Sequence, residues 1–390
     1  MSKSNNGDEL SRQYPNLASR EMCTGCSACA ESCAFQCLKM KEDKYGFSYP
    51  RLSESQKCIG CRSCERACPI LSGGYTLKDK PVVYAAYTNN EEIRNCSSSG
   101  GIFTEIAKYV INNNGSVCGA VFDDQYNVKH VIVTDTQQLS SLRRAKYAES
   151  KLNNVFTEIK QQLLLGKLIL FAGTPCQVAG LKSYLKEDFQ NLICIDFVCR
   201  GIPAPEAWKK YIRYRAKKDA WGKNPVEINM RSKKTGWSKY QYSVQFIYDN
   251  KEYFSVSRRD PFMKALVDGT LIRDSCTNCL FKGMNRASDI TLGDFWGIWN
   301  INPAMDDNRG TSVLLINTEK GCQIFDRIKN NISYHEERIE DVCKYNTSIN
   351  VSTKRSMKIN GLEIVIEKGF GYYLIKRKIT RLLDLISRRM

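Results

Sequence analysis

The sequence predicts an α/β (α+β) protein in which a small cysteine-rich unit precedes a larger sheet domain. Two observations support this class. Cysteines gather in two runs within residues 21–71, and from residue 81 onward short apolar stretches alternate with amphipathic ones. Such alternation is typical of a mixed or parallel sheet with helices on both faces. The 390 residues give room for two or three domains.

We expect five segments along the chain. Residues 1–18 are polar and non-periodic, which predicts a disordered tail. Residues 19–74 form the cysteine-rich unit, which ends at a Gly-Gly turn. The sheet domain follows in two parts, 80–160 and 161–335, and residues 336–390 form a C-terminal extension. The N-terminus lacks the apolar core of a signal peptide, and no apolar run approaches about 20 residues, so we expect a cytoplasmic protein.

Each cysteine run has the spacing C-x2-C-x2-C-x3-C. In bacterial dicluster ferredoxins, three cysteines of one run and the fourth of the other hold each 4Fe–4S cluster. The first cluster is therefore predicted on Cys23, Cys26, Cys29 and Cys68, and the second on Cys58, Cys61, Cys64 and Cys33. Ala34 stands where proline usually follows the fourth cysteine, and an additional Cys37 lies close by. We interpret Cys37 as a spare thiol, although its presence leaves the identity of one ligand open.

Two other uses of cysteine fit this pattern less well. Paired C-x2-C motifs also build zinc sites, but zinc does not explain the third and fourth cysteine of each run. A disulfide framework needs an oxidising compartment, and nothing marks the chain as secreted. The 18 cysteines therefore favour metal ligation.

Beyond the cysteine runs, apolar patterning predicts the elements of the sheet domain. Between the two runs, residues 45–52 alternate apolar and polar residues and predict a small hairpin. Strands are predicted at 82–88, 116–123, 129–135, 167–173 and 191–199, and helices at 102–113, 154–165 and 178–187. Loops at Ser97–Gly101, Thr174–Gln177 and Cys199–Gly201 follow these elements. Ligands of such sheets bind at the carboxyl ends of strands.

The Ser97–Gly101 loop opens a helix, whose free N–H groups favour a phosphate. It is neither GxGxxG nor a P-loop, so it does not indicate NAD or ATP, and a flavin phosphate or pyrophosphate suits it better. An ordinary helix cap with glycines for tight packing is the alternative.

Four cysteines outside the two runs follow strands or form a pair. These are Cys176, Cys199, Cys276 and Cys279, and they predict a third 4Fe–4S cluster. Zinc is the next choice, and buried cysteines acting as small hydrophobes are the structural alternative. His130 and His335 are the only histidines, and neither accompanies a nucleophile signature.

The formal charge of +17 is compatible with nucleic acid or with an acidic protein partner. Because the basic residues are spread along the chain, we favour an acidic redox partner and expect no nucleic acid. The last twenty residues are denser in charge and form a basic amphipathic helix. Such a helix can lie on an anionic membrane, giving peripheral contact, or dock on the protein itself.

Several stretches resemble the β-subunit family of coenzyme F420 hydrogenases and dehydrogenases. They are SSSGGIFTEI, AKYAES, FAGTPCQVAGLKSYL, IDFVCRGIPAPEAWKKYI and CTNCLFKGMNRASDITLGDFWG, within about residues 80–300. An N-terminal dicluster ferredoxin is also found in longer members. The resemblance implies FAD, and clusters that connect the flavin with a ferredoxin-like donor.

Matched position by position, the resemblance implies a set of cofactor-binding residues. They are Ser98, Ser99, Gly100, Gly101, Lys146, Tyr147, Thr174, Pro175, Gln177, Arg286, Asp289 and Asp294, with Cys176, Cys199, Cys276 and Cys279 around a cluster beside the flavin. Lys146 and Arg286 are candidates for stabilising reduced flavin or phosphate. In the family, a histidine commonly follows the cysteine that matches Cys199, but this chain has Arg200 at that position. The resemblance therefore does not imply that the protein uses the deazaflavin.

These observations predict an iron–sulfur flavoprotein oxidoreductase. Clusters carry one electron each, whereas a flavin exchanges one or two, so the pair can connect a ferredoxin-like donor with a small organic substrate. One alternative is transfer between ferredoxin and deazaflavin. Another is a cluster-bearing protein that binds nucleic acid or a partner. A steep salt dependence of its affinity for DNA or RNA, without bound flavin, would favour this alternative. No catalytic residue is identified.

Overall fold

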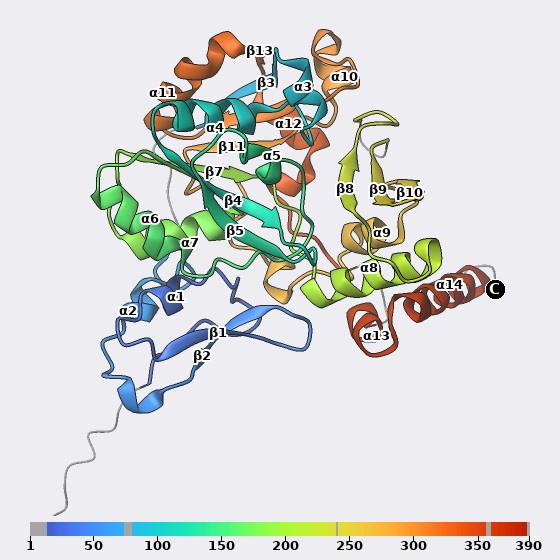
Figure 1. Ribbon diagram of the computed structural model, residues 1–390, viewed down its shortest axis with the longest axis horizontal. Helices are drawn as coiled ribbons and strands as arrows, with labels where there is room; N and C mark the ends of the chain where they lie inside the picture. Colours follow the sequence, from blue (N-terminus) through green and yellow to red (C-terminus); the bar gives the residue numbers. More distant parts are fainter. Residues whose placement is uncertain (1–13, 74–79, 239–240, 356–359, 388–390) are drawn as a thin grey trace, which may run out of the picture.

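The computed structural model describes residues 14–73, 80–238, 241–355 and 360–387 (Figure 1). Most of the predicted tail lies outside these residues. A small N-terminal unit lies against one end of an eight-stranded mixed sheet, which has helices on both faces. The predicted fold class is confirmed.

The N-terminal unit contains an antiparallel hairpin and two single-turn helices. Strand β1 (Leu38–Glu42) pairs with β2 (Ser48–Leu52), so the stretch at 45–52 supplies the second strand and the first lies upstream of the prediction. Helices α1 (Ala28–Glu31) and α2 (Ser63–Arg66) each close a cysteine loop, and a 3-10 turn, η1 (Ser55–Lys57), precedes the second loop.

The large sheet has the strand order β13-β3-β12-β11-β7-β6-β4-β5. Its centre is parallel, from β4 through β6 and β7 to β11, and both flanks are antiparallel. The strands are β3 (Val82–Thr88), β4 (Ser116–Phe122), β5 (Val128–Val133), β6 (Ile169–Ala172), β7 (Leu192–Phe197), β11 (Ile290–Asp294), β12 (Ser312–Ile316) and β13 (Ile332–Glu336). Strands β3 to β7 confirm the five predicted segments.

Alternating side chains divide the core between the two faces of this sheet. Leu170 and Ile193 face one side, with α4 (Ile102–Asn112) and α11 (Glu319–Ile328). Phe171 and Cys194 face the other, with α6 (Val155–Leu164) and α7 (Pro175–Leu185). Shorter helices complete the rim: α3 (Glu91–Asn95), α5 (Leu139–Leu142), α10 (Ile298–Ile301) and α12 (Ile339–Tyr345).

A second, three-stranded sheet stands beside the first and was not predicted. It consists of β8 (Glu227–Ser232), β9 (Ser243–Tyr248) and β10 (Lys251–Val256), packed with α8 (Pro205–Ala220), α9 (Pro261–Val267) and α13 (Gly361–Lys368). Its core is aromatic and centres on Trp208, Tyr211, Phe246 and Phe262. Phe47 and Tyr49 of the N-terminal hairpin belong to the same buried cluster.

The predicted C-terminal helix is α14 (Phe370–Ser387), at the edge of this second unit (Figure 1). Phe370 and Tyr373 are buried against it, and the Arg377 guanidinium donates to Asp268 at 2.5 Å. Ile375, Ile379, Leu382 and Leu383 are exposed. Among the helices of the described residues, none is long and apolar enough to cross a membrane.

Candidate iron–sulfur and flavin sites

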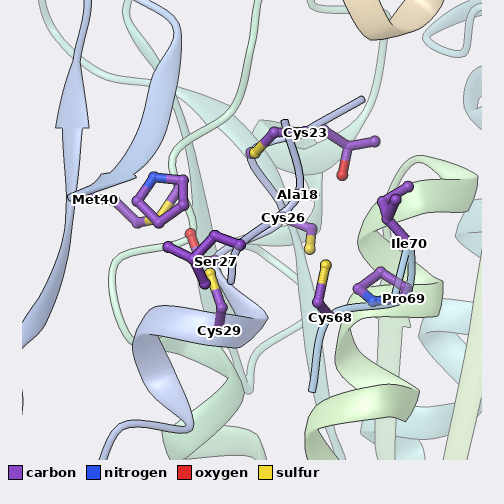
Figure 2. A pocket seen from close by; sticks show the side chains of 13 residues that line it. Ala18, Cys23, Cys26, Ser27, Cys29, Met40, Cys68, Pro69 and Ile70 are labelled. Carbon is purple, nitrogen blue, oxygen red and sulfur yellow. The ribbon is translucent and has the colours of Figure 1, made fainter. Parts of the chain in front are cut away.

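The four cysteines predicted for the first cluster line one cavity, here called the inner cavity. Figure 2 shows the side chains of Cys23, Cys26, Cys29 and Cys68 gathered around it, with Met40, Pro69 and Ile70 beside them. Cys26 also packs against α7, where a Cβ added at Gly180 would lie 2.9 Å from its Cβ and Sγ atoms. The interdomain contact therefore requires a glycine on the helix.

The cysteines predicted for the second cluster line an outer cavity. Its lining contains Cys33, Cys58, Cys61 and Cys64, together with the spare thiol of Cys37. Cys61 is exposed, whereas Cys26 at the corresponding position of the inner loop is buried. The outer cavity is thus the one closer to solvent.

Both cysteine loops follow the same backbone path. Gly25 (φ 72°) and Ser27 (φ 63°) of the first loop match Gly60 (φ 71°) and Arg62 (φ 56°) of the second, all in the left-handed region. Glycine adopts this conformation without the steric penalty that a Cβ brings. The two turns direct three cysteines of each run toward one point.

A buried arginine ties the inner loop to the sheet domain. Arg273 donates to the carbonyl oxygens of Cys23 and Ser48, each at 2.8 Å, and to the Glu149 carboxylate at 2.5 Å. A fourth contact reaches Cys23 Sγ at 3.8 Å. Its guanidinium also lies 4.0 Å from the centre of the Tyr49 ring. One side chain thus holds the loop, the hairpin and the carboxylate together.

The four remaining predicted cysteines surround a third cavity. Cys176 lies in the first turn of α7, Cys199 follows β7, Cys276 ends a 3-10 turn, η2 (Asp274–Cys276), and Cys279 follows it. Their lining also includes four basic residues, Arg200, Arg273, Lys282 and Arg286. Lys282 is held by the carbonyl oxygens of Cys199 and Ser348.

The chemistry of these sites fits iron–sulfur clusters. Burial raises the pKa of Cys26 and of Cys276 to about 12, and the pKa of Cys176 also lies well above its usual value because of burial. Bound iron stabilises such thiolates, and the nearby cations offset the negative charge of a thiolate-ligated cluster.

The three cavities lie in sequence. Thr24 lines both the inner and the third cavity. Cys29 of the inner cavity and Cys64 of the outer cavity are close enough for their charges to interact. The inner cavity therefore lies between the outer cavity and the third.

The Ser97–Gly101 loop is packed closely against the sheet. A Cβ at Gly100 would lie 2.4 Å from the Ala86 carbonyl oxygen, and Gly101 (φ 86°) begins α4 without a side-chain cap. The Gly100 N–H donates to Ser312 Oγ, whereas the buried Ser98 Oγ has no partner in the described structure. Tight packing thus explains Gly100, and the Ser98 hydroxyl is left for another group.

Arg231 of β8 lies beside this loop and was missed in the sequence. It donates to both Asp294 carboxylate oxygens at 2.8 Å and to the Ser98 carbonyl at 3.2 Å, while its buried Nε has no partner among the described atoms. Tyr147 Oη lies 3.5 Å away, and Tyr242 stacks on the guanidinium. Three residues predicted to bind the cofactor, Ser98, Tyr147 and Asp294, therefore meet around Arg231.

Other predicted residues lie apart from this group or bond within the protein. Lys146 donates to the Arg143 and Arg144 carbonyls, and burial together with Arg144 lowers its pKa to about 7. Thr174 and Gln177 form a capping box at α7, next to Pro175. The list is completed by Asp289, which accepts from the Cys194 N–H, and Arg286, which pairs with Asp196 and lines the third cavity. Their cofactor roles remain predictions.

A dicluster unit joined to a mixed sheet with a third thiol-lined cavity defines an iron–sulfur redox protein. Family models agree with this class. A 4Fe–4S dicluster domain matches residues 22–71, and the N-terminal and C-terminal models of the coenzyme F420 hydrogenase/dehydrogenase β subunit match 83–157 and 166–342. The chain belongs to this β-subunit family of iron–sulfur oxidoreductases.

Two other comparisons complete this result. A search of curated proteins gives no match. Among solved structures, a chain of the xenon-derivatised F420-reducing NiFe hydrogenase complex from Methanosarcina barkeri is 14% identical, with a TM-score of 0.46. The alignment covers 73% of this chain and 97% of that chain.

Proposed function

We propose that this protein is an iron–sulfur flavoprotein oxidoreductase that connects a one-electron protein carrier with a small organic substrate. The observation that carries this proposal is that three thiol-lined cavities lie next to one another, and that Thr24 lines both the inner and the third of them. Clusters bound there would supply one-electron transfer, and FAD would exchange one or two electrons with substrate.

The proposed ligands are the cysteines that line each cavity. Cys23, Cys26, Cys29 and Cys68 would hold the inner cluster, and Cys33, Cys58, Cys61 and Cys64 the outer one. Cys176, Cys199, Cys276 and Cys279 would hold a third 4Fe–4S cluster, since all four line one cavity with compensating cations. Iron and sulfide analysis of anaerobic protein tests this set, with about twelve irons per chain expected.

FAD would lie near the group around Arg231. Ser98 Oγ and Arg231 Nε are buried donors without partners among the described atoms, and a flavin or its phosphates can accept from both. Lys233 stands next to them, donating to the Ser99 carbonyl at 2.7 Å, and burial with nearby Arg94 lowers its pKa to about 7. The alternative substrate, a deazaflavin, would use the same flavin.

Flavin content of Arg231 variants tests this part of the proposal. Arg231→Gln should lose at least about tenfold in bound flavin while keeping its iron, because a charged donor to the cofactor is removed. Arg231→Lys retains the charge and should recover part of the binding. Arg309→Gln, at an exposed arginine, is the control. Unchanged flavin in folded Arg231→Gln contradicts the proposed site.

The donor would dock over the outer cavity. Phe35 and Ile59 are exposed there, and Ile59 is 65% accessible. Arg62 lines the same cavity, and the same unit also presents exposed Lys39, Arg51, Lys57 and Arg66, partly paired with Glu54 and Glu65. Exposed cations together with exposed apolar side chains suit an acidic redox protein such as a ferredoxin.

Peripheral membrane contact through α14 is a separate proposal. Its exposed apolar residues Ile375, Ile379, Leu382 and Leu383 adjoin the exposed cations Lys376 and Lys378, which suits an anionic lipid surface. Replacing Leu382 and Leu383 by serine should abolish flotation with anionic vesicles. Flotation that persists in this variant contradicts the proposal.

A further inference from the structure

The outer cavity contains one more thiol than a cubane cluster needs. Five cysteines line it: Cys33, Cys37, Cys58, Cys61 and Cys64. The inner cavity contains four. The fifth thiol is Cys37, which is 3% exposed and has its sulfur 3.3 Å from the sulfur of Cys33.

The backbone between these two cysteines explains their contact. Gln36 has a left-handed φ of 52°, and its N–H donates to the Cys33 carbonyl at 2.9 Å. This turn returns the chain to the cavity at Cys37. The Cys37 carbonyl then accepts from the Ser53 N–H at 2.9 Å, next to strand β1. Cys37 is thus held in place by the hairpin rather than by the cysteine loop.

The other cysteine run supplies a natural comparison. Leu71 donates to the Cys68 carbonyl at 3.1 Å, as Gln36 does to Cys33, so the two turns correspond. The residue corresponding to Cys37 is Ser72. It is exposed, and its hydroxyl donates back to the Cys68 carbonyl at 2.9 Å. The inner cavity therefore has no fifth thiol at this position.

We propose that Cys37 is a reserve ligand of the outer cluster. When Cys33 is lost or replaced, the sulfur of Cys37 would bind the iron that Cys33 held. Where Cys33 is still present as a thiolate, the iron bond to its sulfur would break, the bond to the Cys37 sulfur would form, and the Cys37 proton would pass to Cys33. Where Cys33 is replaced, the Cys37 proton would pass to solvent water. No electron is gained or lost, and the close sulfur–sulfur contact provides the proton path.

The location of the reserve thiol has a physical reason. Exposed thiolates and their clusters are the ones that oxidants reach first. The outer cavity includes exposed Cys61, whereas the ligands of the inner cavity are more covered. A second thiol at the outer site lets the cluster persist after damage to Cys33.

Iron content and electron paramagnetic resonance (EPR) of anaerobically purified full-length variants test the inference. Cys37→Ala should keep all clusters, because Cys33 is the primary ligand. Cys33→Ala should also keep its iron but show an altered EPR signal from the outer cluster, whereas Cys33→Ala with Cys37→Ala should lose about four irons. Cys68→Ala is the matched control and should lose about four irons, since Ser72 offers no thiol.

Two results would overturn the inference. One is equal iron loss in Cys33→Ala and in the double variant, which leaves no role for Cys37. The other is loss of the outer cluster in Cys37→Ala alone, which makes Cys37 a primary ligand. The inference rests on the proposed ligands of the outer cavity. The iron content of the wild-type protein distinguishes failure of the inference from failure of the proposed function, because a wild-type chain without the two N-terminal clusters contradicts the proposed function itself.

Discussion

Between Cys23 and Cys29 the chain follows the same path as between Cys58 and Cys64, with left-handed residues at matching positions and a single helical turn after each loop. Their surroundings differ. The first loop is covered by α7 and by the buried Arg273, and the second faces solvent beside exposed Ile59 and Arg62. Identical local geometry therefore serves two positions, one inside the protein and one at its surface.

The largest expected difference between the two loops is in stability: replacing the buried Arg273 should destabilise the protein far more than replacing an exposed arginine beside the outer loop. Arg273→Gln leaves Glu149 buried without its cation, which costs about 3–5 kcal/mol. Arg66→Gln, beside the outer loop and exposed, should stay within about 0.5 kcal/mol. Thermal unfolding of the anaerobic holoproteins measures both. Similar midpoints for the two variants would show that the inner loop does not depend on Arg273.

A methyl group beneath the inner loop should have a smaller effect. Gly180→Ala places a Cβ 2.9 Å from Cys26, and overpacking of this kind costs about 1–3 kcal/mol. Release of iron to a chelator should accelerate for the inner cluster and not for the outer one. The control is Gly371→Ala, where the nearest atom is 3.5 Å away in the Tyr214 ring. Uniform acceleration at both clusters would contradict the specific contact.

Charge reversal beside the outer cavity should slow reduction of the protein by its donor and leave the free energy of unfolding nearly unchanged. Lys57→Glu with Arg62→Glu should slow reduction by an acidic ferredoxin roughly tenfold at low ionic strength, because the cations steer its approach. The difference should shrink at high salt. Lys217→Glu with Lys218→Glu, exposed on α8, is the control. Stopped-flow rates that fall equally in both double variants would rule out a local docking face.

The sequence predicted most of what depends on local pattern. Cysteine spacing grouped eight predicted ligands, and strand-end positions with one C-x2-C pair grouped the other four, so that the members of each set line one cavity; apolar alternation located strands β3 to β7. Contacts made across long stretches of chain were missed. Arg273 reaches Cys23 over 250 residues, and Arg231 meets Asp294 only through tertiary packing. Nothing in the neighbouring residues marks either arginine.

The three-stranded unit was missed for a related reason. Its strands β8 to β10 pair only with one another, and its aromatic core is completed by Phe370 from the C-terminus and by Phe47 and Tyr49 from the N-terminus. No single window of sequence contains enough of this core to indicate it. Cys37 was noted as a spare thiol, but its contact with Cys33 depends on the left-handed turn at Gln36.

Sharing of the aromatic core has a mechanical consequence for the N-terminal unit. Tyr45 and Lys44 also contact Glu363 of α13, so the hairpin is fastened to the far end of the chain as well as to α7. A ferredoxin-like unit attached in this way does not swing between partners as a tethered shuttle would. The proposed electron exchange between clusters in its inner cavity and the third cavity would take place across a fixed gap, and solvent viscosity should leave that internal rate unchanged.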